Sequence, residues 1–134
     1  MLKSNNASNF SSDYFIMKLT WSNLQSLDQA TISTQPQVAG VYRLSYKSAD
    51  GSFYVFYVGN APKSLQESLM EHLLESEENV CIKTTIKNLE CYFKIAEVND
   101  SESRLDTVKT MADHFKPKCN LQKLEGKTIE VNFN

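Results

Sequence analysis

Gly40–Lys47 reads GVYRLSYK and Phe53–Val58 reads FYVFYV, and these two stretches decide the fold. The first alternates between two sets of side chains, and the second is a dense run of β-branched and aromatic residues, so both predict β-strands. Between them, Asp50-Gly51 favours a turn that requires positive φ. We therefore expect an antiparallel hairpin.

The segments after the hairpin alternate between helix and strand patterns. Ser64-x-x-Glu67 is a capping box, which predicts a helix that continues to about Ser76. Pro117 is expected to end a second helix, because proline cannot continue one. In chain order, the predicted elements are a helix over 64–76, a strand over 89–98, a helix with N-cap choices from Asp100 to Ser103 that stops at Pro117, and an edge strand over 128–133.

The segments before the hairpin are more polar. Residues 1–12 are mostly Ser and Asn, and we expect a disordered N-terminal tail there. Thr20 resembles an N-cap and predicts a short helix that carries Trp21 and Leu27, with a loop over 28–39.

The chain has 134 residues, of which 41% are hydrophobic, and this predicts one folded domain over residues 13–134. The order of elements predicts an α+β class, with a small antiparallel-rich mixed β-sheet flanked by helices. The formal net charge of -2 argues against a general nucleic-acid binder.

Neither a membrane span nor a secretory signal is predicted, because no long apolar run is present and the N-terminus is polar. We therefore expect a cytoplasmic location without membrane association. The cysteines, Cys81, Cys91 and Cys119, are odd in number and lack C-x-x-C spacing, so we expect reduced thiols and neither a disulfide framework nor a zinc site.

Two tripeptides frame the hairpin, Gly40-Val41-Tyr42 at its start and Tyr57-Val58-Gly59 at its end. A helix that contains His72 follows, and the second long helix ends at Pro117-Lys118-Cys119-Asn120. Together these elements resemble the GIY-YIG nuclease superfamily. The resemblance covers residues 40–120 and implies a GIY-YIG nuclease-like α+β fold.

In that family a tyrosine acts as or beside the general base, and an arginine on the first helix clamps the phosphate. A glutamate on the second helix holds one divalent metal ion. The resemblance places the tyrosines at Tyr42 and Tyr57, and a histidine found in some members at His72. It places the arginine at Ser68 and the glutamate at Val108, and neither side chain can perform that role.

Each remaining candidate has a plain structural interpretation. Tyr42 and Tyr57 are either catalytic remnants or aromatic sheet residues. His72 is either a general acid or base, or a half-buried residue beside the apolar stripe of the helix. Asp106 is a weak candidate metal ligand, and Glu102 is a second carboxylate near it in the sequence.

Acidic residues recur along the predicted first helix and form a stripe that would repel phosphates. These residues are Glu67, Glu71, Glu75 and Glu78. Few basic residues lie near the hairpin, and Arg43 and Lys63 are the candidates for contacts with an anionic ligand. The stripe and these two cations are therefore the candidate binding surfaces.

Three functions follow from these observations. The first is a catalytically degenerate domain that binds a protein partner through the acidic stripe or the aromatic strand face, without a cofactor. The second is a structure-specific DNA endonuclease with a rearranged active site, which would need Mg²⁺ or Mn²⁺. The third is a nucleic-acid-binding domain that does not cleave, which the acidic charge disfavours.

Overall fold

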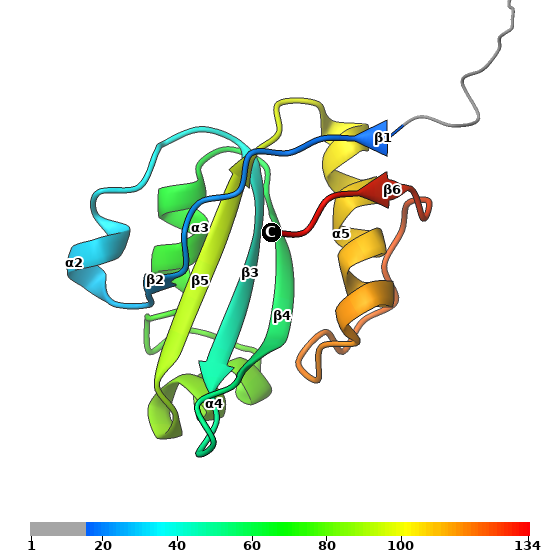
Figure 1. Ribbon diagram of the computed structural model, residues 1–134. Coiled ribbons are helices and arrows are strands. Elements are labelled where there is room, and N and C mark those ends of the chain that lie inside the picture. Colours follow the sequence, from blue (N-terminus) through cyan, green and yellow to red (C-terminus); the bar gives the residue numbers. More distant parts are fainter. Residues whose placement is uncertain (1–15) are drawn as a thin grey trace, which may run out of the picture.

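The computed structural model describes residues 16–134, so the tail predicted for residues 1–12 lies outside the described part. A four-stranded sheet forms the centre of the molecule (Figure 1). Its strands, in spatial order, are β2 (Gln25–Ser26), β5 (Cys91–Glu97), β3 (Gly40–Lys47) and β4 (Phe53–Ala61), and all neighbours are antiparallel. The α+β class is therefore confirmed.

The hairpin forms where the sequence predicted it. β3 pairs with β4 from Gly40 opposite Ala61 to Lys47 opposite Phe53, and the register shifts once between Leu44 and Ser45. Gly51 has φ of 88°, as the predicted turn requires. β4 continues past the predicted end at Val58, so both glycine-tyrosine tripeptides lie on adjacent strands.

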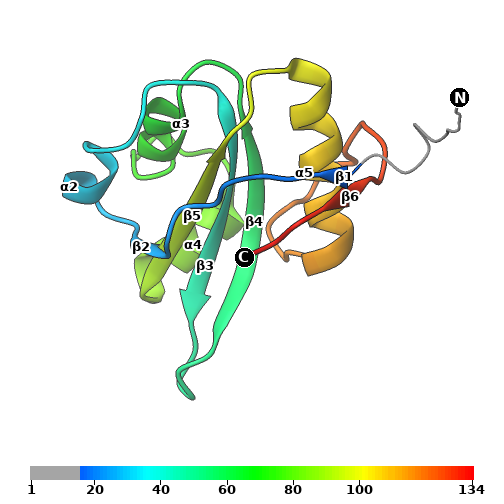
Figure 2. The ribbon, with the colours of Figure 1, turned by 45° about the horizontal axis from the view of Figure 1, so that its top comes forward.

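Helices cover both faces of the sheet (Figures 1 and 2). α2 (Gln29–Ile32), α3 (Leu65–Glu71) and α4 (Val80–Asn88) lie on what we call the first face. α5 (Ser101–Phe115) packs against β3 and β4 on the opposite, second face. Because side chains alternate along a strand, consecutive residues of β3 serve the two faces in turn.

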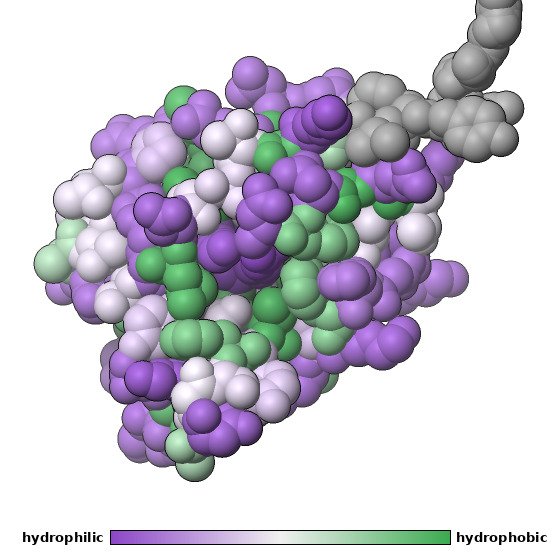
Figure 3. All heavy atoms as spheres, in the orientation of Figure 1, coloured by the Kyte–Doolittle hydropathy of each residue, from purple (hydrophilic) through white to green (hydrophobic). Residues whose placement is uncertain are grey.

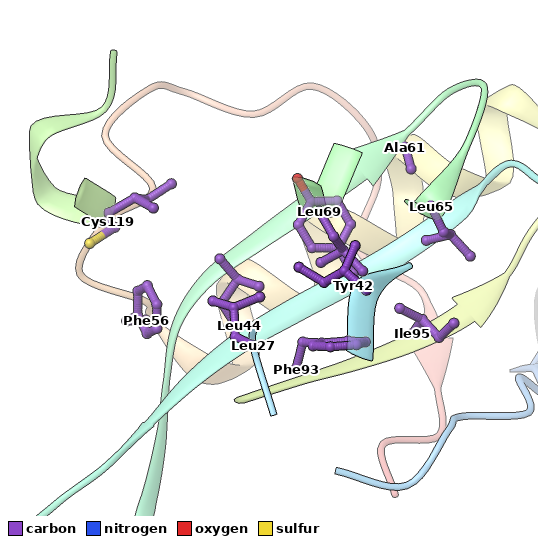
Figure 4. Close-up of a cluster of buried hydrophobic side chains, with 12 residues drawn as sticks. Leu27, Tyr42, Leu44, Phe56, Ala61, Leu65, Leu69, Phe93, Ile95 and Cys119 are labelled. Atoms are coloured by element: carbon purple, nitrogen blue, oxygen red, sulfur yellow. The ribbon is translucent and has the colours of Figure 1, made fainter. Parts of the chain in front are cut away.

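A separate hydrophobic cluster lies on each face. The first cluster gathers around Phe56, Phe93, Leu65 and Leu69, which are fully buried (Figure 4). Burial of each such side chain stabilises the fold by about 1.5–3 kcal/mol. The second cluster consists of Trp21, Val41, Val58, Ala96, Val98, Val108 and Met111.

α3 begins at the predicted capping box, where the Ser64 hydroxyl accepts from the backbone N–H of Glu67 at 3.1 Å. The helix ends at Glu71, and the prediction that it continues to Ser76 is wrong. The chain instead turns and begins α4, whose N-cap Asn79 accepts from Ile82 N–H. The sequence VCIKTTIKN is rich in β-branched residues, which have weak helix propensity, so α4 was not predicted.

The short helix predicted after Thr20 is absent, and residues 18–24 run without regular structure into β2. Tertiary bonds fix this segment beside β5, since Ser22 N–H donates to Ile95 O and the Ser22 hydroxyl accepts from Ile95 N–H. The predicted loop over 28–39 contains α2, whose N-cap Asp28 accepts from Thr31 N–H. The N-cap signal at Thr20 was therefore outweighed by hydrogen bonding to β5, and the N-cap signal at Asp28 was not recognised from the sequence.

The C-terminal strand is shorter than predicted and belongs to another sheet. β6 (Glu130–Val131) pairs in parallel with β1 (Ile16–Met17), beside α5. The predicted edge strand over 128–133 therefore does not extend the main sheet, and among residues 16–134 parallel pairing occurs in this two-stranded ribbon alone. α5 itself ends as expected, with Lys116 in the left-handed conformation immediately before Pro117.

Cys81 and Cys119 form a disulfide, which corrects the prediction of reduced thiols. They are 38 residues apart in the sequence, yet their Cα atoms lie 5.3 Å apart because the segment after α5 returns to the start of α4. An odd number of cysteines leaves one thiol over, and that residue is Cys91. Burial raises the pKa of the Cys91 thiol to about 11, so it is an unreactive thiol at neutral pH.

Candidate functional site

A chain of three hydrogen-bonded side chains lies on the first face of the sheet. The Tyr42 hydroxyl is 2.7 Å from His72 Nε2, and His72 Nδ1 is 2.5 Å from Glu77 Oε1. Only 3% of Tyr42 is exposed, and the His72 and Glu77 side chains are 10% and 11% exposed. We call this chain the Tyr-His-Glu relay.

Each member of the relay is positioned by a different element. Tyr42 lies on β3, His72 is the C-cap of α3, and Glu77 belongs to the turn between α3 and α4. The second carboxylate oxygen of Glu77 accepts from Asn79 N–H at 2.9 Å, which fixes the carboxylate at the start of α4. The turn that the sequence did not predict therefore completes the relay.

Gly59 makes room for the Tyr42 ring. A Cβ atom at Gly59 would lie 2.3 Å from Tyr42 Cζ and 2.5 Å from its hydroxyl oxygen, which no side chain tolerates. Tyr42 is directly opposite Gly59 in the β3–β4 pairing. The packing of the Tyr42 ring therefore requires a glycine at position 59, whether or not Tyr42 takes part in catalysis.

Burial controls the ionisation of both tyrosines. The pKa of Tyr42 is well above its usual value, first because of desolvation and then because of nearby Tyr57, Glu77 and Glu71. The pKa of Tyr57 is also raised, by burial and by Glu77. Both phenols are therefore protonated at neutral pH, and formation of a tyrosinate at Tyr42 would require transfer of the phenolic proton to its partner, His72 Nε2.

The relay reaches the surface through a cavity of about 410 Å³, which Tyr57 and Glu77 line together with Cys119 and Asn120. The Asn120 side chain bonds both the N–H and the C=O of Val58 at 2.9 Å. It thereby pairs with the free edge of β4 beside Tyr57. Asn120, which the resemblance singled out, acts here as a backbone clamp.

The two positions that the resemblance assigns to catalytic charge carry none. Ser68 is a half-buried residue of α3. Val108 is 5% exposed and packs in the hydrophobic cluster of the second face, whereas Tyr42 belongs to the cluster of the first face. The sheet therefore separates Val108 from the relay.

The remaining charged candidates on α5 have structural partners. Asp106 accepts from the backbone N–H of Lys127 at 2.8 Å, and Glu102 is exposed in the first turn of the helix. The buried Arg104 donates to Asn60 Oδ1 and to the carbonyl oxygens at the end of β5. Within residues 16–134, no group of three or more His, Cys, Asp or Glu side chains is placed to hold a metal ion. The residues present do not fit the family's metal site.

The predicted acidic stripe is only half formed. Glu67 and Glu71 are exposed on α3, but α3 ends at Glu71, so Glu75 and Glu78 lie beyond it and leave the helical face. Of the two candidate cations, Lys63 is exposed and Arg43 is buried on the second face. The prediction of a continuous four-carboxylate face is wrong because the helix is shorter than its charge pattern.

Aromatic side chains gather at the end of the hairpin. Phe53 and Tyr54 are 46% and 48% exposed. Phe53 packs edge to face on Tyr92 at 5.2 Å, and Tyr54 contacts Tyr46 at 5.7 Å between ring centroids. We call these four residues the aromatic end, and Lys118 Nζ lies 5.1 Å from the Tyr46 ring beside it.

Glu77 is the site residue that sequence reasoning missed. It lies five residues after His72, a spacing that does not place two residues on one face of a helix, and the turn between α3 and α4 brings them together.

Comparison of the chain with protein-family models, curated proteins and solved structures found no match. Within the described residues, no helix combines the length and the apolar character needed to cross a membrane.

Proposed function

We propose that this chain is a catalytically degenerate GIY-YIG-like domain that binds a protein partner. The observation that carries the proposal is the burial of Val108 in the hydrophobic cluster of the second face, on the opposite side of the sheet from Tyr42. A carboxylate at that position would have to be desolvated, and from there it would not reach the tyrosines. The metal-dependent step of the family therefore has no ligand at its expected position.

The aromatic end supports a protein partner. Half-exposed aromatic side chains contribute most to protein interfaces, because they bury a large area at a small cost in conformational entropy. Phe53 and Tyr54 project from β4 and Tyr92 from β5, with β3 between these two strands, and Lys118 supplies one charge beside Tyr46. A single cation beside several rings suits a peptide better than a phosphate backbone, which needs many.

In a binding domain the Tyr-His-Glu relay has a structural role. It ties β3 to the end of α3 and to the start of α4 through two hydrogen bonds in a buried setting. Such bonds contribute about 0.5–1.5 kcal/mol each, and loss of one partner costs more because the other is left unsatisfied. The relay then fastens the first face without performing chemistry.

An endonuclease with a rearranged active site is the second candidate, and the relay is the observation that favours it. A tyrosine bonded to a histidine that is oriented by a carboxylate can lose its proton to the imidazole. Against this candidate, Tyr42 is 3% exposed, and a phosphate would reach only Tyr57 and Glu77 in the cavity. The Glu77 carboxylate repels an anion, and the Tyr57 phenol carries no positive charge that would attract one.

A nuclease assay separates the two candidates. The full chain is incubated with single-stranded and branched DNA in Mg²⁺ or Mn²⁺, beside Tyr42→Phe. We expect no cleavage above that of a reaction without protein. Cleavage that Tyr42→Phe abolishes would overturn the proposal and establish the rearranged active site.

A binding assay tests the partner surface. The full chain is used to capture proteins from a lysate of its source cells, beside a Phe53→Ser, Tyr54→Ser double variant and a Val80→Ser control. Val80 is 72% exposed on α4 and lies outside the aromatic end. We expect a stoichiometric partner that the double variant loses and the control keeps, whereas equal capture by all three would contradict this use of the aromatic end.

The cytoplasmic location that the sequence favoured remains a prediction. The Cys81–Cys119 disulfide argues in the other direction, because cytosolic reductants keep most thiols reduced. Both the location and the disulfide can be tested by isolating the protein from its source under acid quench and counting its free thiols. One free thiol per chain indicates an oxidising compartment, and three indicate the cytosol.

A further inference from the structure

Acidic and basic side chains are unevenly distributed along the chain. Residues 67–78 contain five glutamates and no lysine or arginine, whereas residues 109–127 contain five lysines and two carboxylates. The first segment comprises most of α3 and the turn before α4, and the second runs from the last part of α5 into the segment before β6. Where the fold brings two such segments together, it creates a surface with one acidic and one basic half.

The two segments meet at residues 120–124, which we call the ridge. The disulfide fixes its start, because Cys119 directly precedes the ridge and is joined to Cys81. Cys119 N–H donates to Phe56 O at 2.9 Å, and the side chain of the first ridge residue bonds both backbone groups of Val58. The ridge is therefore held beside β4 and the end of α5 (Figure 1), and a surface that is fixed in advance loses little conformational entropy on binding.

An acidic cavity lies between the ridge and the start of α4. It is the cavity of about 410 Å³ described above, and Glu77 and Glu78 line it together with residues of the ridge. Glu77 is bonded to His72, whereas Glu78 is exposed. Among the residues that the structure describes, no lysine or arginine lines this cavity. The cavity therefore attracts cations.

A basic cavity of about 440 Å³ lies between the ridge and α5, and Lys109, Lys116 and Lys123 line it. Asp113 is the one carboxylate among its described lining residues, and it pairs with Lys109 at 2.8 Å. Within residues 16–134, the exposed Lys116 and Lys123 form no salt bridge. Figure 3 shows hydrophilic side chains at the edge of the molecule beyond α5. Two cations of this cavity therefore lack a carboxylate partner.

The two cavities share a border that carries an exposed apolar side chain. Three residues of the ridge, Asn120, Gln122 and Leu124, line both cavities. Between them, Leu121 is 70% exposed. An acidic and a basic half on either side of one ridge are complementary to themselves, because a two-fold rotation about an axis through the ridge places each half against its opposite.

We propose that the ridge and its two cavities form the interface of a homodimer, with a two-fold axis through the ridge. The free lysines of each basic cavity pair with Glu78 of the second copy, and the two Leu121 side chains meet near the axis and bury apolar surface. A second copy fits better than an unrelated protein, because one surface supplies both halves of the complementarity. Exposed ion pairs and a small apolar contact produce a weak dimer, which dilution or salt dissociates.

This interface does not rest on the proposed function. The four residues of the aromatic end line neither cavity, so that surface stays available to a partner in the dimer. Failure of one proposal therefore leaves the other standing.

Sedimentation equilibrium of the full chain measures the association over a range of protein concentrations, in low and in high sodium chloride. We expect reversible monomer–dimer behaviour. The dimer should weaken as salt is added, because the ion pairs of the interface are screened. A chain that stays monomeric at every concentration in low salt would overturn the proposal.

Charge reversal tests the crossed arrangement of the two copies. Glu78→Lys and Lys123→Glu each replace attraction with repulsion at two symmetric places, so each is expected to weaken the dimer at least about tenfold. An equimolar mixture of the two variants is expected to associate about as strongly as the wild type, because every altered position then meets an opposite charge. This recovery also shows that both variants are folded.

Two matched controls separate this interface from a general effect of net charge. Glu67→Lys on α3 and Lys87→Glu on α4 make the same charge changes at exposed positions that line neither cavity. We expect both to dimerise as the wild type does. Equal weakening by the controls, or a mixture of Glu78→Lys and Lys123→Glu that associates no better than either variant alone, would overturn the proposal.

Discussion

The two faces of one sheet treat their polar side chains in opposite ways, although consecutive residues of β3 supply both. On the first face Tyr42 enters a closed relay, in which the hydroxyl, the imidazole and the carboxylate are each bonded within the protein. On the second face Arg43 and Lys94 both donate to a backbone oxygen of Asn134, the last residue of the sequence, and Arg43 Nη1 has no hydrogen-bond partner among the described residues. The first face is therefore fastened by bonds between side chains of the sheet and the helix ends, and the second by bonds from the sheet to the last residue of the sequence.

The disulfide should show the largest effect, because it closes the first face. Cys81→Ser is expected to lower the free energy of unfolding by about 4 kcal/mol, from the chain entropy released by opening a 38-residue loop. Urea unfolding followed by circular dichroism measures the change. Cys91→Ser, at the free cysteine, is the control and should cost less than about 1 kcal/mol. Equal losses would mean that the disulfide does not form in solution.

Opening the relay should have the next largest effect. Glu77→Leu leaves His72 Nδ1 and Asn79 N–H without their acceptor, so we expect a loss of about 2–3 kcal/mol of stability. The exposed neighbour Glu78→Leu is the matched control, with an expected change within about 0.5 kcal/mol. Thermal or urea unfolding of both variants makes the comparison, and similar values would show that the first face is as open as the second.

Alkaline pH should weaken the first face selectively. Because the pKa of Tyr42 is raised by burial, the unfolded chain loses this proton first, at its ordinary value near pH 10. The stabilisation is complete below that pH and is lost as the pH rises toward the pKa of Tyr42 in the folded chain, by up to about 1.4 kcal/mol per pH unit.

Urea unfolding of the wild type and Tyr42→Phe at pH 8 and pH 10.5 tests this expectation. The variant lacks the buried phenol, so its stability should fall less between the two pH values. A parallel fall in both proteins would mean that Tyr42 titrates at its ordinary pKa and that the relay is accessible to water.

The smallest effect on stability is expected on the second face. Arg43→Met keeps an apolar side chain against Trp21 and Phe115 but removes a desolvated charge with one unpartnered nitrogen. The lost hydrogen bond to Asn134 and the relieved repulsion with Lys94 oppose each other, so we expect a change below about 1 kcal/mol. Urea unfolding measures it, and a loss as large as that of Glu77→Leu would mean that Arg43 is a structural residue.

The hairpin and the long helix were predictable because their signals are local. The β-branched and aromatic runs, the Asp50-Gly51 turn, the capping box at Ser64 and the stop at Pro117 all depend on residues a few positions apart. Each element formed where it was predicted, although β4 is longer and α3 shorter than expected. The helix expected after Thr20 failed because its residues bond to β5, a strand about seventy residues later.

The candidate site was only partly predictable for the same reason. Tyr42, Tyr57 and His72 were named from sequence, and the structure brings their rings within 5.3–6.2 Å of one another. Glu77 has no periodic relation to them. The acidic stripe illustrates the opposite error, since a regular spacing of four carries meaning only while the helix that it assumes continues.

Sequence alone determined the α+β class, the antiparallel hairpin and the capping of α3, because each depends on side-chain chemistry or on spacing along one element. Tertiary structure alone decided that Cys81 meets Cys119, that Glu77 completes the relay and that Arg43 and Lys94 share one oxygen. These contacts join residues whose approach is fixed by strand pairing and by turns, and no local pattern encodes the distance between them.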